Sequence, residues 1–329
     1  MKKHFGSISN LLLLLLGVMM LLGKNHYLLG SVYGVLLWPF LILIGIKFWI
    51  ARARKRLKQE KYLLILGGLL LASWTYDHIP RINWDRETVE QRQLNVLTYN
   101  LFFKNQYPQQ IINEIKVTKP DVLMVQELTP EWNTKLQPSV YARYKYRKTF
   151  LDRRTHGFGI FSTYPILSHH LIKNERSQAI FQICELLIDG KKIVMINAHM
   201  ASPAKIVEQP DLDVISVFKH NYAKREAQWA QLEAYLGEHF PEHPKVIAGD
   251  LNTMKIEGLY RQIRHQWVDA FAKQGEGWRC TFPNVAAIPF PVITLDYILG
   301  QGIKPLEAKV LKGGSSDHFA VWAKIAICE

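Results

Sequence analysis

Apolar and polar positions divide the chain into a strongly apolar N-terminal part and a longer part in which short apolar runs alternate with polar segments. In the longer part, runs rich in β-branched and aromatic residues predict strands at 94–100, 121–128, 157–162, 181–188, 192–200, 245–250, 295–299 and 320–327. Apolar residues at helical spacing predict helices at 108–118 and 223–239. Many short strands with few helices favour an α/β class in which sheet packs on sheet and helices cover the outside. The chain has neither GxGxxG nor GxxxxGK[ST], so a doubly wound nucleotide-binding sheet is not indicated.

Three apolar segments precede this pattern, at 9–23, 27–50 and 62–76. About 20 consecutive apolar residues cross a bilayer as a helix, so the second segment is long enough to span and the third is short. We predict a membrane anchor of two or three transmembrane helices over residues 1–76. The basic start of the chain would also suit a secretory signal, but no small-residue cleavage site follows the first segment. Core helices of a soluble protein are the remaining alternative.

The basic loop 51–61, ARARKRLKQEK, sets the orientation that we expect for the anchor. Lys and Arg close to the ends of spans favour the cytoplasm. With three spans everything after residue 76 lies outside the cytoplasm, whereas with two spans it stays inside, and we favour three. We therefore expect an integral membrane protein with a linker at 77–93 and an extracytoplasmic catalytic domain at 94–329.

The formal net charge of +13 is unevenly distributed, because residues 1–79 hold 10 Lys and Arg against 2 Asp and Glu. Most of the basic excess therefore belongs to the N-terminal part, and the overall charge alone does not indicate a nucleic-acid partner. Cys184, Cys280 and Cys328 lack CxxC spacing, so neither a zinc site nor a disulfide framework is indicated.

Polar side chains stand in or next to six apolar runs, in the strings LTYN, MVQEL, INAHM, IAGDLNT, TLDYIL and SSDHF. A buried strand that ends in a polar residue delivers that side chain to the edge of a sheet. The polar residues that these strings supply are Asn100, Glu127, His199, Asp250, Asn252, Asp296, Asp317 and His318. Carboxylates, carboxamides and imidazoles in this mixture are the groups that metal-assisted phosphoryl chemistry requires.

Phosphoester hydrolysis needs a metal, a group that activates or positions water, and donors for the developing charge. Glu127 ends an apolar strand and offers the hard oxygen that Mg²⁺ prefers, and Asn100 can orient it or contact metal and phosphate. Asp250 and Asn252 lie two apart on an extended segment and point the same way. The first suits alignment of the attacking water, and the second suits phosphate binding.

Two histidines complete the candidate site. His318 follows Asp317, a carboxylate that can bind metal, and Asp296 can fix the orientation of the imidazole and raise its basicity. His199 suits a hydrogen bond to a phosphate oxygen. Taken singly, the strings also fit a solvated turn, a Gly-Asp turn, a helix N-cap at Ser316 or Asp317, or a structural histidine. Their joint occurrence in one order favours a common site.

The strings together resemble the endonuclease/exonuclease/phosphatase superfamily, which includes DNase I-like nucleases, neutral sphingomyelinases and inositol polyphosphate 5-phosphatases. The resemblance covers about residues 93–327 and rests on the GDxN and SDH strings with the early Asn100 and Glu127. The stretch GFGIFSTYPI also matches the family's G-x-x-I-x-S-x-x-P-I strand. The resemblance implies a four-layer α/β/β/α sandwich, here preceded by transmembrane helices, with Mg²⁺ or Mn²⁺ as cofactor.

Carried over by position, the resemblance implies a metal site and a nucleophile site. Glu127 would bind the metal, with Asn100 as its neighbour and Asp317 close by. Asp250 would activate or orient the nucleophile, and Asn252 would bind phosphate.

The same carry-over makes His318 the catalytic histidine, polarised by Asp296, and His199 the family's N-x-H histidine. Two positions depart from the family's pattern. Thr294 stands where the family often has Arg, and Leu251 makes GDLN of the commoner GDFN. All the expected catalytic residue types are present.

These features favour a membrane-anchored, divalent-metal-dependent phosphodiesterase that acts on nucleic acid, phospholipid or another surface phosphodiester. The basic, aromatic stretch 141–156 either grips a phosphate backbone or anionic headgroups, or is an exposed strand with a solvated charged face. A phosphomonoesterase acting on a sugar or inositol phosphate is one alternative, with Arg153, Arg154 and Lys205 as candidates for binding the terminal phosphate. A non-enzymatic membrane binding module is another. The sequence indicates no specific protein partner.

Overall fold

The computed structural model describes residues 92–202, 214–285 and 291–328, together with scattered helical residues between 42 and 68. Apart from those scattered positions, the predicted anchor at 1–76 and most of the predicted linker lie outside the described residues. None of the helices that the structure describes is both long enough and apolar enough to cross a membrane.

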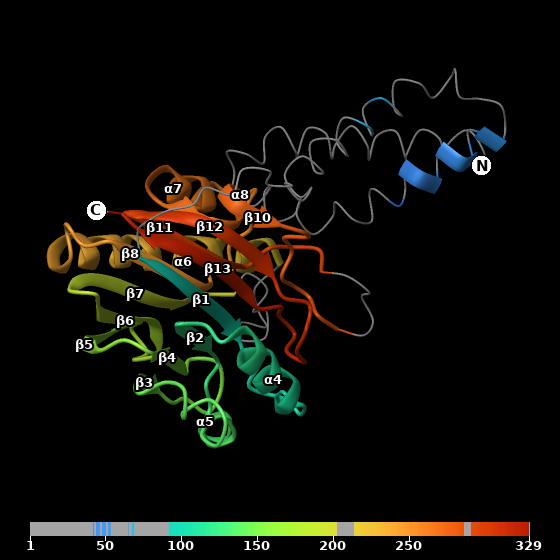
Figure 1. The fold of residues 1–329 in the computed structure, drawn as a ribbon. Helices are drawn as coiled ribbons and strands as arrows, with labels where there is room; N and C mark the ends of the chain where they lie inside the picture. The colour runs from blue at the N-terminus through green and yellow to red at the C-terminus, as the bar shows by residue number, and fades with distance from the viewer. Residues whose placement is uncertain are drawn as a thin grey trace.

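Two mixed sheets form the centre of the fold (Figure 1). The first contains β1 (Gln93–Asn100), β2 (Val122–Gln126), β3 (Tyr146–Phe150), β4 (Phe158–Ser162), β10 (Gly275–Glu276), β12 (Ile303–Val310) and β13 (Val321–Ile327). The second contains β5 (Ile166–Lys173), β6 (Ala179–Ile188), β7 (Lys191–His199), β8 (Lys245–Asp250), β9 (Val268–Asp269) and β11 (Asp296–Gln301). Within the described residues the strand orders are β10-β12-β13-β1-β2-β4-β3 and β5-β6-β7-β8-β11-β9. Strands β3 and β5 are therefore edge strands.

Helices cover the outer face of each sheet. The first sheet carries α4 (Pro108–Thr118) and α5 (Pro130–Leu136), whose apolar side chains join its outer cluster. The second sheet carries α6 (Val214–His239) and α7 (Gly258–Gln266) in the same way. The short α8 (Ala270–Gln274) packs against β12. The result is a mixed α/β sandwich of two sheets, as the sequence predicts.

Neighbouring residues on the central strands enter different apolar clusters. Met124 of β2 and Met195 of β7 belong to the cluster between the sheets. Leu123 belongs to the cluster shared with α4 and α5, and Ile196 to the one shared with α6 and α7. Successive side chains on a strand point to opposite faces, so a strand that is covered on both faces must be apolar throughout. This is why the central strands read as continuous apolar runs.

The predicted helix at 108–118 and the predicted strand at 245–250 match α4 and β8. The helix predicted at 223–239 begins earlier, at Val214. The strands β5 and β12 and the helices α5 and α7 were not predicted, because they are short or half-exposed and lack a continuous apolar run. The exposed strand that was one alternative for 141–156 is confirmed by β3, whose three central residues are exposed. All three cysteines are free, consistent with the absence of a disulfide framework.

A buried ion pair joins α6 to the start of α7. Arg225 Nη2 lies 2.7 Å from Glu257 Oε2, and both side chains are fully buried. Arg225 Nη1 also donates to the carbonyl of Ala201 at 3.4 Å, and the Ala201 amide donates to Gln228 Oε1 at 2.9 Å. Helix α6 therefore holds the segment that follows β7, and the last residue of β7 is the candidate His199.

We expect Arg225→Leu to lower the free energy of unfolding by about 3–5 kcal/mol, because it leaves the Glu257 carboxylate buried and unpaired. The matched control is Lys192→Ala, which removes an ion pair to Glu185 at 3.3 Å whose lysine is 53% exposed. The control should change stability by less than about 1 kcal/mol. Urea unfolding of both variants measures the difference, and equal effects would contradict the expectation.

Candidate active site

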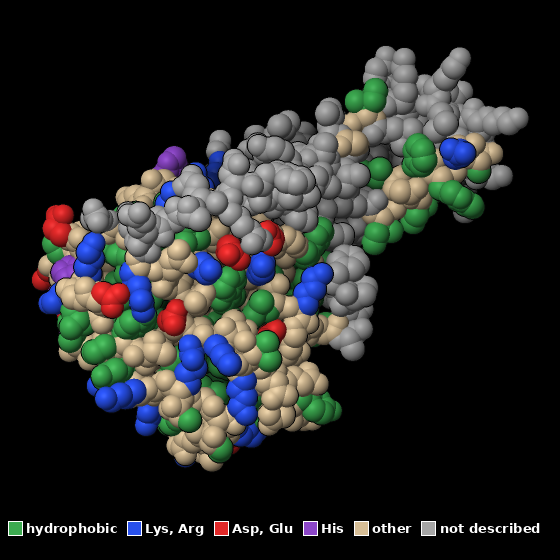
Figure 2. Space-filling model, viewed as in Figure 1, with side chains coloured by type: hydrophobic (Ala, Val, Ile, Leu, Met, Phe, Trp, Pro, Cys, Tyr) green, Lys and Arg blue, Asp and Glu red, His purple; other side chains and the backbone are tan. Residues whose placement is uncertain are grey.

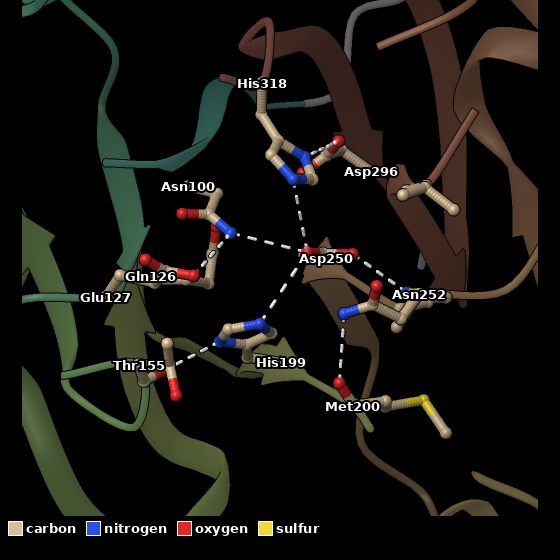
Figure 3. Close-up of polar contacts among 12 residues, drawn as sticks. Asn100, Gln126, Glu127, Thr155, His199, Met200, Asp250, Asn252, Asp296 and His318 are labelled. Atoms are coloured by element: carbon tan, nitrogen blue, oxygen red, sulfur yellow. Dashed lines mark hydrogen bonds and ion pairs between the residues drawn. The ribbon is translucent and has the colours of Figure 1, made fainter. Parts of the chain in front are cut away.

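The candidate residues gather at one end of both sheets (Figure 3). In the first sheet Asn100 ends β1, and the parallel register places it beside Gln126 at the end of β2, so that Glu127 follows directly. Asp317 and His318 precede β13, which runs antiparallel to β1 and so begins at the same end. Strand direction alone therefore brings residues more than 200 positions apart to one place.

In the second sheet, three candidate residues sit side by side on neighbouring strands. His199 at the end of β7 is in register with Asp250 at the end of β8. Asp250 is in turn in register with Asp296 at the start of β11. The first two strands are parallel and the third is antiparallel, so two strand ends and one strand start meet at the same edge.

The carboxylate of Asp250 is the centre of the group (Figure 3). Its Oδ2 lies 3.3 Å from Asn100 Nδ2, 3.7 Å from His199 Nε2 and 3.7 Å from His318 Nε2. Its Oδ1 accepts a hydrogen bond from the backbone amide of Asn252 at 2.8 Å. Asp250 is 1% exposed, and burial raises the pKa of its carboxyl group above the ordinary value, with Asp296 adding to the effect.

The imidazole of His318 is held from behind by Asp296. His318 Nδ1 lies 2.8 Å from Asp296 Oδ2, and the ring packs against Phe282 at 4.8 Å between centroids. Burial disfavours the charged ring, but the carboxylates of Asp296 and Asp250 outweigh that effect and raise the pKa of His318 to about 10. With Nδ1 engaged, Nε2 faces Asp250 and the open part of the site.

Asp296 is itself fixed by the backbone of its strand. The Thr281 hydroxyl accepts hydrogen bonds from the amides of Leu295 and Asp296, at 3.1 and 3.2 Å. These contacts hold the start of β11 so that the carboxylate keeps its place behind the histidine.

His199 is oriented by a loop from the other sheet. Its Nδ1 lies 2.9 Å from the carbonyl oxygen of Thr155, which only accepts, so Nδ1 carries the hydrogen. This leaves Nε2 directed at Asp250. The sequence predicted His199 but gave no indication of Thr155, whose backbone oxygen makes the contact.

Glu127 and Asn100 form the other side of the site. Glu127 Oε1 lies 3.4 Å from Asn100 Nδ2, and its Oε2 accepts from the Phe103 amide at 2.9 Å. Burial raises the pKa of Glu127 to about 7, a net effect in which the Phe103 amide opposes the rise and the charge of Asp317 adds to it. Burial also raises the pKa of Asp317.

The donor set fits a hard divalent cation. The carboxyl groups of Glu127, Asp250 and Asp317 all have a raised pKa because burial disfavours their charged forms, and a cation among them would compensate that charge. Carboxylate and carboxamide oxygens are the ligands that Mg²⁺ and Mn²⁺ prefer. Asp250, Asp296 and His318 also bring ligand atoms within 4.8 Å of one another. That group suits a hard cation less well, because Asp296 and His318 already bind each other.

The backbone at the site adopts conformations that side chains disfavour. Glu127 and Asn252 have φ of 58° and 49°, in the left-handed region. Gly249, with φ of 150°, approaches β7 so closely that a Cβ there would lie 2.0 Å from the carbonyl oxygen of Ala198. The glycine of GDLN is thus required for β7 and β8 to meet at His199 and Asp250. Backbone strain of this kind is common at functional sites.

Asn252 does not point its whole carboxamide into the site. Its Nδ2 donates to the carbonyl of Met200 at 3.0 Å, and its side chain is 4% exposed. The structure therefore brings Asn252 to the site and anchors it to the segment after β7. The second hydrogen of the same Nδ2 is the group that remains for a phosphate oxygen.

A buried polar network behind the site was missed by the sequence analysis. Gln126 Nε2 donates to Asn197 Oδ1 at 2.6 Å and to Thr98 Oγ1 at 2.9 Å. Asn197 Nδ2 donates to the carbonyls of Val125 and Gly159 at 2.9 and 3.1 Å, across the two sheets. Gln126 and Asn197 are fully buried. Gln126 precedes Glu127 by one residue, and Asn197 precedes His199 by two. A polar residue at such a position within an apolar strand is the sequence signal that would have identified them.

The helix N-cap, one alternative raised by the sequence for the SDH string, is excluded by the structure. In the described residues no helix follows Ser316, so the N-cap interpretation is wrong. Instead, Ser316 Oγ donates to the carbonyl of Asn100 at 2.6 Å and accepts from the His318 amide at 3.1 Å. Asn284 holds the same string through the carbonyls of Ser316 and Asp317, at 2.8 and 2.7 Å.

The position of Thr294 also has a structural account. Thr294 and Arg279 line one small pocket together with Asp296. The Arg279 guanidinium is buried, contacts Asp269 and donates to Tyr260 Oη at 3.0 Å. An arginine thus occupies this region although it does not come from position 294.

Comparisons with known proteins agree with this geometry. The model of the Endonuclease/Exonuclease/phosphatase family matches residues 97–318. A comparison with curated proteins gives no match.

Several solved structures have the same fold. A family protein from Bacteroides thetaiotaomicron has 15% identity and a TM-score of 0.57, covering 73% of this chain and 100% of its own. A mannosyl-6-phosphatase from the same species has 15% identity and a TM-score of 0.56, covering 71% and 100%. TDP2 from D. rerio, complexed with single strand DNA product, has 14% identity and a TM-score of 0.55, covering 71% and 98%. At this identity the likenesses show the fold alone.

The family match begins before Asn100 and ends at His318, so it spans all eight candidate residues that the structure brings to one edge of the sandwich. On that match, the chain belongs to the endonuclease/exonuclease/phosphatase family.

Proposed function

We propose that the protein is a membrane-anchored, divalent-metal-dependent phosphoesterase that hydrolyses phosphodiester bonds. One observation carries the proposal: the Asp250 carboxylate lies 3.7 Å from the Nε2 atoms of both His199 and His318, with Glu127 and Asn100 on its open side. Members of this family are hydrolases that act on phosphate esters. The described site offers side chains that could hold a metal, position water and donate hydrogen bonds to phosphoryl oxygens.

In this proposal Asp250 orients the attacking water and accepts its proton. A buried carboxylate with a raised pKa is a stronger base than a solvated one, which suits this role. As the water oxygen forms its bond to phosphorus, the bond from phosphorus to the leaving oxygen breaks. The backbone amide of Asn252 donates a hydrogen bond to Asp250 Oδ1 and so keeps the carboxylate in the orientation that presents Oδ2 to the water.

The imidazoles would stabilise the charge that develops on the phosphoryl oxygens. His318, with its pKa raised to about 10, is protonated at neutral pH and donates from Nε2, while Asp296 holds its Nδ1. His199 presents Nε2 from the opposite side because Thr155 holds its Nδ1.

Glu127, Asn100 and Asp317 are the residues that would hold Mg²⁺ or Mn²⁺. When bound, such an ion neutralises negative charge on phosphoryl oxygens. Asn100 has a second role, because its Nδ2 donates to both Glu127 and Asp250 and so fixes their separation.

The similar structures support phosphoester chemistry without deciding its type. TDP2 from D. rerio is complexed with a DNA product, which supports a phosphodiester substrate. The mannosyl-6-phosphatase from Bacteroides thetaiotaomicron supports the phosphomonoester alternative. We favour the diester because exposed basic side chains continue beyond the site along the neighbouring strands.

The membrane anchor is part of the proposal and rests on residues 1–76. In the described helical positions of that region, large apolar side chains are exposed to solvent, with Ile42 at 61%, Phe48 at 46% and Trp49 at 70%. Large exposed apolar side chains, where they gather, are typical of a surface that contacts lipid or protein. The basic loop 51–61 favours an extracytoplasmic catalytic domain.

The full-length protein in detergent, with Mg²⁺, should hydrolyse a small generic phosphodiester, and Asp250→Asn should lower kcat by about 10²–10⁴-fold because the group that accepts the proton is lost. The matched control is Asp189→Asn, which changes a 60% exposed aspartate in the β6–β7 turn. The control should retain wild-type kcat. Phosphate release from monoesters but not from diesters would favour the phosphomonoesterase instead.

Glu127→Gln should raise the Mg²⁺ concentration needed for half-maximal activity more than about 10-fold, because a charged oxygen ligand becomes neutral. Glu131→Gln is the control, since it removes the same charge four residues away at a fully exposed position. Mg²⁺ titrations of hydrolysis for the two variants provide the comparison. If both variants titrate like the wild type, Glu127 is not a metal ligand.

Carbonate washing of membranes should leave the full-length chain in the pellet, because apolar segments that span the bilayer are not removed by high pH. Protease added to cells whose plasma membrane is intact, but whose outer wall or outer membrane has been removed, should then cleave the chain beyond residue 92. Extraction by carbonate would contradict the anchor, and cleavage only after cell lysis would place the domain in the cytoplasm.

A further inference from the structure

Strands β3 and β5 are the edge strands of the two sheets, and they lie against each other on one open side of the sandwich. Gln182 Nε2, from the second sheet, donates to the carbonyl of Lys148 on β3 at 2.9 Å. Lys173 of β5 places its Nζ 5.1 Å from the ring centre of Phe150 on β3. We refer to the exposed cations of this side as the β3–β5 edge: Lys148, Arg153, Arg154, Lys173 and Arg176.

Both edge strands end at the candidate site. Phe150, the last residue of β3, pairs with Phe158 of β4, which pairs with Gln126 next to Glu127. On the other sheet, Lys173 ends β5 and is in register with Ala179, and Phe181 two residues later is in register with Ala198. Ala198 precedes His199. The β3–β5 edge is therefore continuous with the catalytic end of both sheets.

The loop between β3 and β4 joins this edge to the site directly. Thr155 binds His199 through its carbonyl at 2.9 Å, and the Asp152 amide donates to the carbonyl of Leu128 at 3.3 Å. Asp152 Oδ1 accepts from the amide of Arg154 at 2.8 Å, so this carboxylate is used by the loop backbone. The exposed guanidinium groups of Arg154 and Arg153 lie one and two residues before Thr155, which makes the contact with His199.

The five cations of the edge outnumber the exposed acids Glu131, which interacts electrostatically with Arg153, and Glu175 in the adjoining turn. No described residue forms an ion pair with any of these five cations. Burial and then the charge of Lys148 lower the pKa of the neighbouring His169. Figure 2 shows Lys and Arg side chains over the region where Figure 1 labels β2, β3 and β4.

We propose that the β3–β5 edge binds the phosphates that flank the scissile bond in a single nucleic-acid strand, which makes such a strand the substrate. Lys148 and Lys173 belong to the two edge strands, and the loops that follow them hold Arg176 and, next to the contact with His199, Arg153 and Arg154, so a polyanion bound at the site would meet several cations. The half-exposed rings of Tyr146 and Phe150 lie among them, and aromatic faces next to cations bind unpaired bases. The inference rests on the proposed function for the site itself.

The test is binding of a fluorescent single strand of about 12 nucleotides to the full-length protein in detergent with EDTA. Two double variants are compared with the wild type. The first combines Lys148→Gln with Lys173→Gln, and the second combines Arg153→Gln with Arg154→Gln. The matched control is Lys116→Gln with Lys119→Gln, two cations at the far end of α4. We expect each edge variant to raise Kd about 10-fold and to reduce the salt slope of log Kd by about 1.4, that is, about 0.7 per lost phosphate contact. The control should match the wild type.

Three results would overturn the inference. The first is a wild-type Kd that does not depend on salt, and the second is an unchanged Kd in both edge variants. The third is unchanged binding of the strand together with lost binding of phosphatidylglycerol vesicles, which would assign the edge to a lipid surface. Hydrolysis of a small phosphodiester with Mg²⁺, measured in parallel for Lys148→Gln with Lys173→Gln, should keep its wild-type kcat. If the wild type itself fails to hydrolyse the small diester, the proposed function fails while strand binding still decides the inference.

Discussion

The buried carboxylate of Asp250 is the constraint on which the rest of this structure depends. At 1% exposure it has lost nearly all contact with water, so protein groups must stabilise its charge. Those groups come from both sheets: Asn100 from the first, His199 from the second, and His318 from the loop before β13. The electrostatic requirement of one side chain thus forces two sheets to meet at a fixed separation.

The separation of the sheets is itself set by polar contacts. Asn197 and Gln126 are fully buried and hydrogen-bond each other, and Asn197 also donates to the backbone of the facing sheet. Hydrogen bonds have narrow distance and angle requirements, whereas apolar contacts tolerate small shifts, so such a network defines one spacing. The network lies one or two residues from Glu127 and His199, so a change in sheet spacing there would change the distances among the candidate site residues.

Much of this site follows from sequence because each candidate residue ends or precedes an apolar strand. Strand pattern predicts that Asn100, Glu127 and Asp250 reach a sheet edge, and the resemblance predicts that they share it. Pattern does not reveal contacts made by backbone atoms, so Thr155 was missed, nor the origin of the buried guanidinium of Arg279. The edge strand β3 could be predicted only as one alternative for 141–156, because a half-exposed strand need not be apolar and its pairing with β4 depends on residues that the local sequence does not contain.

The bond from Ser316 Oγ to the carbonyl of Asn100 joins two residues that are 216 positions apart. Synthesis proceeds from the N-terminus, so the histidine that completes the site emerges only after almost every other strand of the domain. A nascent chain that stops before His318 lacks part of the candidate site. The described group of side chains can therefore assemble only after residue 318 has been synthesised and both sheets have packed together.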